Sequence, residues 1–567
     1  MSSVSHNSVI MASGTLASRL TGMIRTILLA AAVGTTGIAA NAYQTGSSVP
    51  QIIYTLISGG IFNAILVPQI VRTLKSENSK KNLDKLVTLS MAILFGVTII
   101  IMAGTHIITS IFLSSSWTPA QHALADAFTL WCTPQIFFYG IYTVLGQILA
   151  AKNRFAMYAW SSVAANVVSC AGFIIFIAMF GNASHKPLDF WTTDKIALTA
   201  GAWTLGVAVQ ALLLFIPLIQ SGYIFSFSWG FRGIGLRSMG NVAVWTIGIT
   251  ILSQITMIIT SRIASGAPLA GGDPYGIAGN GSYQNAMTIY ILPYSLFAVS
   301  LTTATFPQIS TFVAERRIRD AADTLESSLR SNSLIMFFFT AVMIAIPLQL
   351  SAVFLPSVSG TELGLIAPIM MALTFSLPAS SAMLLAQRAF YAFEDGKSPF
   401  IIACIQSGIL IIIQLFTALA INPHHQAMWL GIAVSVSYYL AMPAVLIMTY
   451  RLFRGNLRIG KLAVSHIKIL IASVCTALVA CVVQFGLSTL FHFSPQSAHG
   501  KAAWFVALLI CDVTTLISGA VYAGVLIGLR EKAFITLILS LLRRISPNIT
   551  FTHRGGKHSV QPPFTLE

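Results

Sequence analysis

The chain of 567 residues is 56% hydrophobic, has a mean hydropathy of +0.80 and carries charge on only 8% of its residues. Soluble domains are charged at roughly a quarter of their residues, so lipid must cover most of this apolar mass. The composition also excludes a disordered chain, a collagen, a coiled coil and a disulfide scaffold. The chain has 32 Lys and Arg against 16 Asp and Glu. In a membrane protein this excess belongs to cytoplasmic loops that face anionic lipid, so no nucleic-acid partner is expected.

Apolar stretches long enough to cross a bilayer recur along the whole chain. A membrane helix needs ~20 mainly apolar residues, and fourteen stretches meet that requirement. We therefore predict an all-α polytopic membrane protein with about fourteen transmembrane helices. The stretches lie near residues 8–33, 40–70, 86–113, 120–150, 157–181, 195–218, 238–261, 280–312, 331–355, 363–391, 399–421, 428–450, 464–490 and 503–528.

The loops between these spans differ in charge. Loops that follow even-numbered spans, such as 72–85, 316–330 and 451–461, hold most of the lysines and arginines. The loops that follow odd-numbered spans hold few. Because basic loops stay in the cytoplasm, both termini are expected there.

The order of the spans predicts four parts. Residues 1–230 and 231–455 each form a six-helix bundle, 456–530 add two C-terminal helices, and 531–567 form a short basic cytoplasmic tail. Residues 531–545 are expected to form either a basic amphipathic helix on the inner leaflet or a solvated tail.

A weak repeat relates the two bundles. Asn41-Ala42-Tyr43-Gln44 in span 2 is followed by Val67-Pro68-Gln69-Ile70, and Tyr283-Gln284-Asn285-Ala286 in span 8 is followed at almost the same distance by Phe306-Pro307-Gln308-Ile309. The offset of six spans gives both halves one orientation, which favours alternating access around a substrate held between them. The alternative is chance similarity between helices that contain proline.

Two arginines inside span 1 are the strongest site signal. A central arginine costs roughly 2.5–3.5 kcal/mol on insertion scales, so Arg19 and Arg25, which lie close to Ser18, are expected to line a cavity rather than face lipid. Arginine is a permanently charged fork that suits phosphate. The alternative is that Arg25 snorkels to the interface or pairs with a carboxylate.

Uncharged polar residues of spans 2 and 8 are candidates for the same cavity. They are Asn41, Gln44, Gln284, Asn285 and Thr288. Such groups bind sugar or peptide, although hydrogen bonds between helices are an equally good explanation. Arg262, at the outer end of span 7, is interpreted as an outer gate or an interfacial charge.

Signals for an enzyme, a cofactor or a metal are missing from the sequence. No GxSxG, HExxH or P-loop motif occurs, and the six cysteines lie in apolar stretches without ligand spacing. His424-His425 is interpreted as a solvated loop. No carboxylate lies in spans 7 or 11, so coupling to the membrane potential is expected instead of an acidic sodium site.

Several short motifs of span 1 and the following segments form a pattern typical of one family. They are Ser18-Arg19, Gly22, Arg25, Asn41-Ala42-Tyr43, Pro50, Gly59-Gly60, Val67-Pro68, Asn153-Arg154-Phe155, Phe390-Tyr391-Ala392, Asp395 and Ser398-Pro399. In these motifs the chain resembles the MviN/MurJ lipid II flippases of the multidrug/oligosaccharidyl-lipid/polysaccharide exporter superfamily. The resemblance implies a multi-pass protein of the bacterial cytoplasmic membrane that transfers an undecaprenyl-diphosphate-linked peptidoglycan precursor from the inner to the outer leaflet. It implies that Arg19 and Arg25 meet the diphosphate, and that membrane lipids and cell-wall synthesis proteins are partners.

Departures from the family pattern keep other functions open. Asn41 stands where the family usually has an aspartate, and Tyr54 or Thr55 and Thr288 stand where it has arginines. The family's carboxylate in span 7 has no match. The alternatives are a flippase for another polyprenyl-linked glycan, a drug exporter of the same superfamily, or a membrane scaffold for cell-wall synthesis that transports nothing.

Overall fold

The computed structural model describes residues 3–57, 79–152, 154, 156–230, 241–498 and 500–545, and every regular element in these ranges is helical. The all-α prediction is therefore confirmed. The helices of the first half are α1 (Ser3–Val33), α2 (Gly37–Ile57), α4 (Ser79–Ala103), α5 (Thr105–Phe112), α6 (Pro119–Cys132), α7 (Gln135–Ala151), α8 (Ala156–Phe180), η2 (Leu188–Phe190), α9 (Thr193–Ile196), η3 (Ala197–Gly201), α10 (Ala202–Leu213) and α11 (Phe215–Gln220).

The second half and the C-terminal helices follow in the same style. They are α12 (Asn241–Ala270), α13 (Asn280–Pro293), η4 (Tyr294–Ala298), α14 (Val299–Ala314), α15 (Ile318–Ala345), α16 (Pro347–Phe354), α17 (Gly360–Thr374), α18 (Leu377–Ala392), α19 (Lys397–Ala420), α20 (Pro423–Leu452), α21 (Ile459–Leu490), α22 (Gly500–Gly528) and α23 (Lys532–Ile545).

Eleven helices among the described residues are long and apolar enough to cross a membrane, and α17 with α18 adds a twelfth if this pair, bent by 46°, is one span. The two other predicted spans coincide with α2 and with α6 and α7. The apolar sequence of α2 is interrupted by the polar residues Asn41, Gln44 and Gln51. Thr133-Pro134 separates α6 from α7, and neither of these two helices is long enough on its own to cross a membrane. The count of about fourteen therefore stays a prediction.

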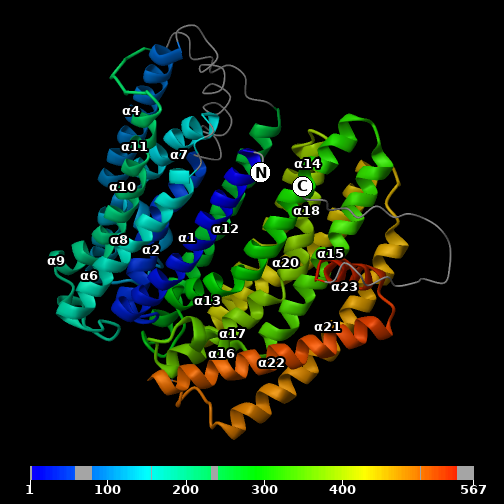
Figure 1. Cartoon of the computed structure of the whole chain (residues 1–567). Helices are drawn as coiled ribbons and strands as arrows, with labels where there is room; N and C mark the ends of the chain where they lie inside the picture. Colours follow the sequence, from blue (N-terminus) through cyan, green and yellow to red (C-terminus); the bar gives the residue numbers. More distant parts are fainter. Residues whose placement is uncertain are drawn as a thin grey trace.

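The two halves pack their helices in the same order. In the first, α1 packs along α8 and α8 along α10, while α2 packs against α6. In the second, α12 packs along α19 and α19 along α20, while α13 packs against α17. Figure 1 shows the blue and cyan helices of the first half beside the green and yellow helices of the second. This shared order is what two repeats of one orientation predict, although the boundaries 1–230, 231–455 and 456–530 remain predictions.

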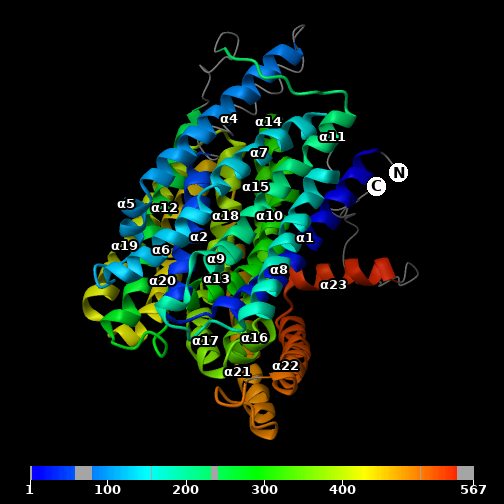
Figure 2. The same cartoon turned by 90° about the vertical axis from the view of Figure 1, so that its left-hand side faces the viewer.

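The C-terminal helices lie outside the two halves. The helix α21 packs along α15 and α22, and Figure 1 shows α21 and α22 in orange on the flank of the second half. In Figure 2 the red helix α23 runs across the direction of the bundle helices. Ala533 and Phe534 at its start pack with a cluster that includes Leu334. Residues 531–545 are thus largely helical, as the amphipathic alternative predicts, while their place on a leaflet stays a prediction.

Some sequence motifs fall outside the described residues. These are Gly59-Gly60, the Val67-Pro68-Gln69-Ile70 part of the repeat, Asn153, Phe155, the loop 231–240 and the tail 546–567.

Candidate substrate site between the two halves

A cavity of about 280 Å³ lies where α1, α2, α7 and α10 of the first half meet α13 of the second. Five of the predicted site residues line this cavity, although they come from three different predicted spans. Its lining residues are Arg25, Thr26, Leu29, Ala30, Val33, Gly34, Ala40, Tyr43, Gln44, Gln51, Tyr139, Trp203, Gly281, Gln284, Asn285 and Thr288.

Arg25 is the charged residue of this cavity. Its side chain is half-buried, and its guanidinium carbon lies 4.3 Å from the centre of the Trp203 ring. A guanidinium over an indole gains roughly 0.5–2 kcal/mol, and this contact uses none of its N–H groups as hydrogen-bond donors. Among the described residues no carboxylate lies within ion-pair distance of Arg25, so pairing with an internal acid does not explain its position. The cavity therefore has an uncompensated positive charge.

Arg19 lies outside the lining and bridges the two halves. Its Nη1 donates to Ser295 Oγ, and its Nη2 donates to the Ser295 carbonyl at 3.3 Å. Ser295 belongs to η4, a π-helical turn that follows Pro293. Ser18 is also outside the lining, and its carbonyl accepts from the amide of Asn166 on α8 at 3.0 Å. The structure thus separates the two arginines by role, with Arg25 at the cavity and Arg19 at a contact between halves.

The neutral polar residues of spans 2 and 8 form the facing walls. Gln44 comes from α2, and Gln284, Asn285 and Thr288 come from consecutive turns of α13. The amide of Asn285 donates to the Gly281 carbonyl at 2.9 Å, and the Thr288 hydroxyl donates to the Gln284 carbonyl at 2.9 Å. These local bonds orient the side chains that border the space around Arg25.

Two further predicted site residues, Asn41 and Arg262, also lie outside the cavity lining. Asn41 is 1% exposed; its Oδ1 accepts from the Gly281 N–H at 2.8 Å and its Nδ2 donates to the Gly37 carbonyl at 2.9 Å. Its amide joins the start of α2 to the start of α13 and does not line the cavity. Arg262 donates to the carbonyls of Ser110 and Ile111, at 2.8 and 3.3 Å, and so caps the end of α5.

Three aromatic residues that were not among the predicted site residues complete the site. The Trp203 ring contacts the Arg25 guanidinium, and Tyr139 and Tyr43 line the same cavity. Tyr43 is stacked on Trp203 with ring centres 6.1 Å apart. No periodicity links residue 203 in span 6 to residue 25 in span 1, so only the packing of the bundle reveals the pair.

The two halves are hydrogen-bonded at the end where α1 meets α2. Besides the bond of Asn41 to Gly281, the Gly37 N–H donates to Pro274 O at 2.9 Å and Ser282 Oγ donates to Thr35 O at 3.1 Å. Thr35 also donates to the buried carboxylate of Glu362 on α17. Gly34 and Gly37 form the turn there with φ of +89° and +83°, which favours glycine. Towards the N-terminus of α1, Arg19 and Ser295 join the halves.

A second cavity of about 420 Å³ lies within the second half, among α12, α13, α18, α19 and α20. Gln284 borders both cavities. The other polar residues that line the 420 Å³ cavity include Gln254, Thr256, Gln406 and Ser407, and none of its lining residues is charged.

The fold and the site together define a class. Two helical bundles of one packing order, built from membrane-spanning helices and enclosing a positively charged cavity at their interface, form a polytopic transporter. The family model described as lipid II flippase MurJ matches residues 29–499. The chain therefore belongs to the lipid II flippase MurJ family, and the resemblance drawn from its motifs is confirmed.

Individual relatives agree with this assignment. A probable lipid II flippase MurJ of Haemophilus influenzae is 22% identical over 554 residues, which cover 92% of this chain and 99% of the relative. One of Rhizobium tropici is 23% identical over 472 residues, covering 78% and 80%. A structure of a lipid II flippase MurJ in an inward closed conformation matches with a TM-score of 0.68 at 19% identity, covering 92% of this chain and all of the other. An inward-facing MATE multidrug transporter of the MOP superfamily matches with a TM-score of 0.61 at 15% identity, covering 79% and 99%.

Proposed function

We propose that this protein moves lipid II, an undecaprenyl-diphosphate-linked peptidoglycan precursor, from the inner to the outer leaflet of a bacterial cytoplasmic membrane by alternating access. The family assignment supports the substrate class, because its members are described as lipid II flippases. The observation that carries the proposal is Arg25, a half-buried arginine without an acidic partner among the described residues, in a cavity between the two halves.

Arg25 is proposed to bind the diphosphate. A guanidinium makes two parallel hydrogen bonds to phosphate oxygens, and these charge-assisted bonds are stronger than neutral ones. The cation–π contact with Trp203 holds the guanidinium in place before the headgroup arrives. Gln44, Gln284 and Asn285 face the same space with neutral amides, which suit the sugar and peptide portions of the headgroup.

The bonds between the halves support an alternating-access cycle. With both termini in the cytoplasm, the end that carries the Asn41–Gly281 and Thr35–Glu362 contacts faces outward and is closed. The Arg19–Ser295 contact lies on the cytoplasmic side of the cavity. Outward opening must break the first set of bonds, and inward opening must break the second.

This orientation is testable by labelling. In a cysteine-free background, a cysteine at the exposed position 319 should resist an impermeant thiol reagent added outside cells, whereas one at position 273 in the loop between α12 and α13 should react. Labelling at 319 with protection at 273 reverses the orientation and rejects this part of the proposal.

The membrane potential is proposed as the driving force. Neither α12 nor α19 contains a carboxylate. Between these helices the Gln414 amide donates to Thr260 Oγ1 at 2.7 Å. An N–H group therefore occupies the space beside the Thr260 oxygen in which a cation would have to bind. A diphosphate carries negative charge, on which a potential of 100 mV exerts about 2.3 kcal/mol per elementary charge.

Rescue of a bacterium depleted of its own lipid II flippase tests the proposal. Expression of this chain should restore growth and normal lipid II turnover, and the Arg25→Ala variant at equal membrane level should not. Failure of the unaltered chain despite membrane insertion favours another polyprenyl-linked glycan or a drug as substrate. Full rescue by Arg25→Ala favours a scaffold that recruits cell-wall synthesis proteins.

A further inference from the structure

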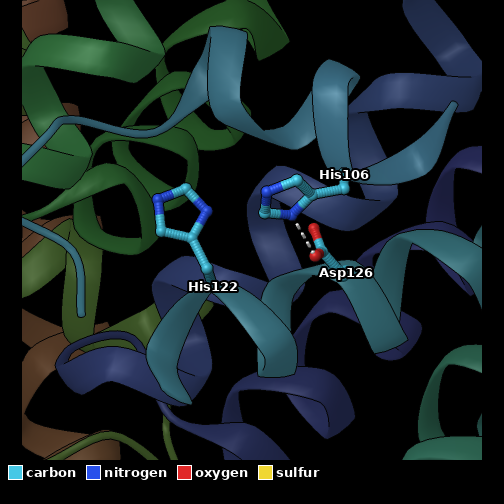
Figure 3. Close-up of side chains that lie close together, drawn as sticks. All are labelled: His106, His122 and Asp126. Carbon is cyan, nitrogen blue, oxygen red and sulfur yellow. Dashed lines mark hydrogen bonds and ion pairs between the residues drawn. The ribbon is translucent and has the colours of Figure 1, made fainter. Parts of the chain in front are cut away.

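Three potential metal ligands meet where α5 turns into α6. His106 lies on α5, and His122 and Asp126 lie one turn apart on α6. Their ligand atoms all lie within 4.8 Å of one another, and His106 Nδ1 is 2.8 Å from Asp126 Oδ2. Figure 3 shows the His122 ring turned toward His106, with the Asp126 carboxylate beside His106.

Two features distinguish this cluster from an ordinary ion pair. The Nδ1 atom of His122 is buried and has no hydrogen-bond partner, although buried polar atoms of this kind are usually paired. The Asp126 carboxylate accepts a second hydrogen bond, from the Thr109 hydroxyl on α5, which fixes its orientation. The site thus contains one held carboxylate and one imidazole nitrogen that lacks a partner.

We propose that His106, His122 and Asp126 form a binding site for a divalent transition metal of the Zn²⁺ class. Imidazole nitrogen and carboxylate oxygen are ligands that Zn²⁺ accepts, whereas Ca²⁺ and Mg²⁺ prefer oxygen alone. Bonds of about 2.0–2.1 Å in a tetrahedron separate ligand atoms by about 3.3 Å. Small side-chain rotations reach that spacing from the geometry of the cluster.

The solvent-facing position of His106 leaves room for a fourth ligand. The His106 side chain is 73% exposed and Asp126 is 24% exposed. Water can therefore complete the coordination without any movement of the helices. The Thr109 bond to Asp126 is the kind of supporting contact that metal-binding carboxylates usually have.

A bound metal would link α5 to α6 next to their contact with α12 of the second half. The α5 carbonyls of Ser110 and Ile111 accept from Arg262 of α12, and Trp117, in the link between α5 and α6, donates to the Ser265 carbonyl at 3.0 Å. An ion that ties α5 to α6 therefore stiffens the contact with α12 at the end of the bundle where α1 meets α2. The sequence motifs predicted no metal site, because fifteen residues and a helix break separate His106 from His122.

Metal binding to the tag-free full-length chain in detergent tests this site independently of transport. We expect one Zn²⁺ per chain in equilibrium dialysis, and visible absorption of a tetrahedral or five-coordinate complex when Co²⁺ is added. Binding should raise the midpoint of thermal unfolding. His106→Ala and His122→Ala should each weaken Zn²⁺ binding more than about 100-fold, and Thr109→Val by about 10- to 100-fold.

The pair His424 and His425, at the start of α20, supplies the matched control. Replacing both with alanine removes two imidazoles from the chain and should leave the stoichiometry and affinity at His106 and His122 unchanged. Variants enter the comparison only if their unfolding midpoint in chelator equals that of the unaltered chain. Absence of Zn²⁺ binding in the unaltered chain, or unchanged binding in the His106→Ala, His122→Ala double variant, overturns the proposal.

Discussion

The two cavities that share Gln284 as a lining residue differ in charge. The one inside the second half is larger, at about 420 Å³, and is lined by neutral side chains. The one between the halves has about 280 Å³ and contains Arg25. Between these two, size favours the first as the binding site, whereas the chemistry of a diphosphate favours the second. The difference favours the fixed charge at the interface between the halves, rather than cavity volume, as the basis on which we propose the site of an anionic headgroup.

The position of the two cavities strengthens this conclusion. The neutral cavity is bordered by helices of one half, so rocking of the halves leaves most of its lining together. The Arg25 cavity takes its walls from both halves, so the same motion opens it to alternate sides. Gln284 borders both cavities, so a substitution there can be compared with one at a residue that lines only the neutral cavity.

The largest effect is expected at Arg25. Arg25→Ala removes the charge from the interface cavity, and each charge-assisted bond lost costs about 1.5–3 kcal/mol, or roughly 10- to 100-fold. We predict that this variant fails to support growth at normal expression. Arg25→Lys should rescue partly, because an ammonium keeps the charge but loses the planar fork that binds phosphate with two hydrogen bonds. Growth of the depleted strain at matched membrane levels measures both; equal growth with Ala and Arg at position 25 contradicts the proposed role.

A severe but smaller loss is expected at Arg19. Arg19→Ala breaks the bond between α1 and η4, and we predict about tenfold slower lipid II translocation per inserted molecule. Ser295→Ala is the matched variant, since it removes the hydroxyl acceptor and keeps the carbonyl that Arg19 also contacts. It should therefore slow translocation less than Arg19→Ala. An unaltered rate in Arg19→Ala would show that this contact plays no part in the cycle.

Gln284 is expected to separate the two cavities directly. A neutral hydrogen bond contributes about 0.5–1.5 kcal/mol, so Gln284→Ala should slow translocation about two- to tenfold. Gln406 lines only the neutral cavity, where its amide donates to Ser437 at 2.9 Å. Gln406→Ala should change the rate less than twofold. The comparison is reversed, and the neutral cavity becomes the binding site, if Gln406→Ala is the slower of the two.

The smallest effect is expected from sodium. Because α12 and α19 lack carboxylates and Gln414 donates to Thr260 and Thr256, replacing Na⁺ with K⁺ in reconstituted vesicles should change translocation less than about twofold. Collapse of the membrane potential should slow it clearly. A strict need for Na⁺ would point to a site of neutral oxygens in the second half.

The sequence predicted the residue types of the site better than their contacts. Arg25, Gln44, Gln284, Asn285 and Thr288 were selected because polar groups inside apolar spans are costly, and the structure places all five around one cavity. The same reasoning also selected Asn41, whose amide is instead satisfied by the backbone on both sides. It selected Arg262, which caps α5. Polarity shows that a side chain avoids lipid but does not show which partner it meets.

The remaining features depend on tertiary packing. In the sequence, nothing distinguishes Trp203 from the other aromatic residues of the spans. Only the placement of α10 beside α1 and α7 brings its ring into contact with Arg25. The all-helical fold followed from hydropathy, while the break at Thr133-Pro134 left α6 and α7 as separate short helices within one predicted span. A proline in an apolar run is compatible with either a kink or a break.

The central claim is that arginine charge at the interface between the halves carries the diphosphate across the membrane. Its most direct test is lipid II translocation in reconstituted vesicles for the Arg19→Ala, Arg25→Ala double variant, normalised to inserted protein. Arg319→Ala, at an exposed position in the first turn of α15, is the matched control. We predict that the double variant falls to the rate of protein-free vesicles and the control keeps the full rate. Full normalised activity in the double variant would contradict the account.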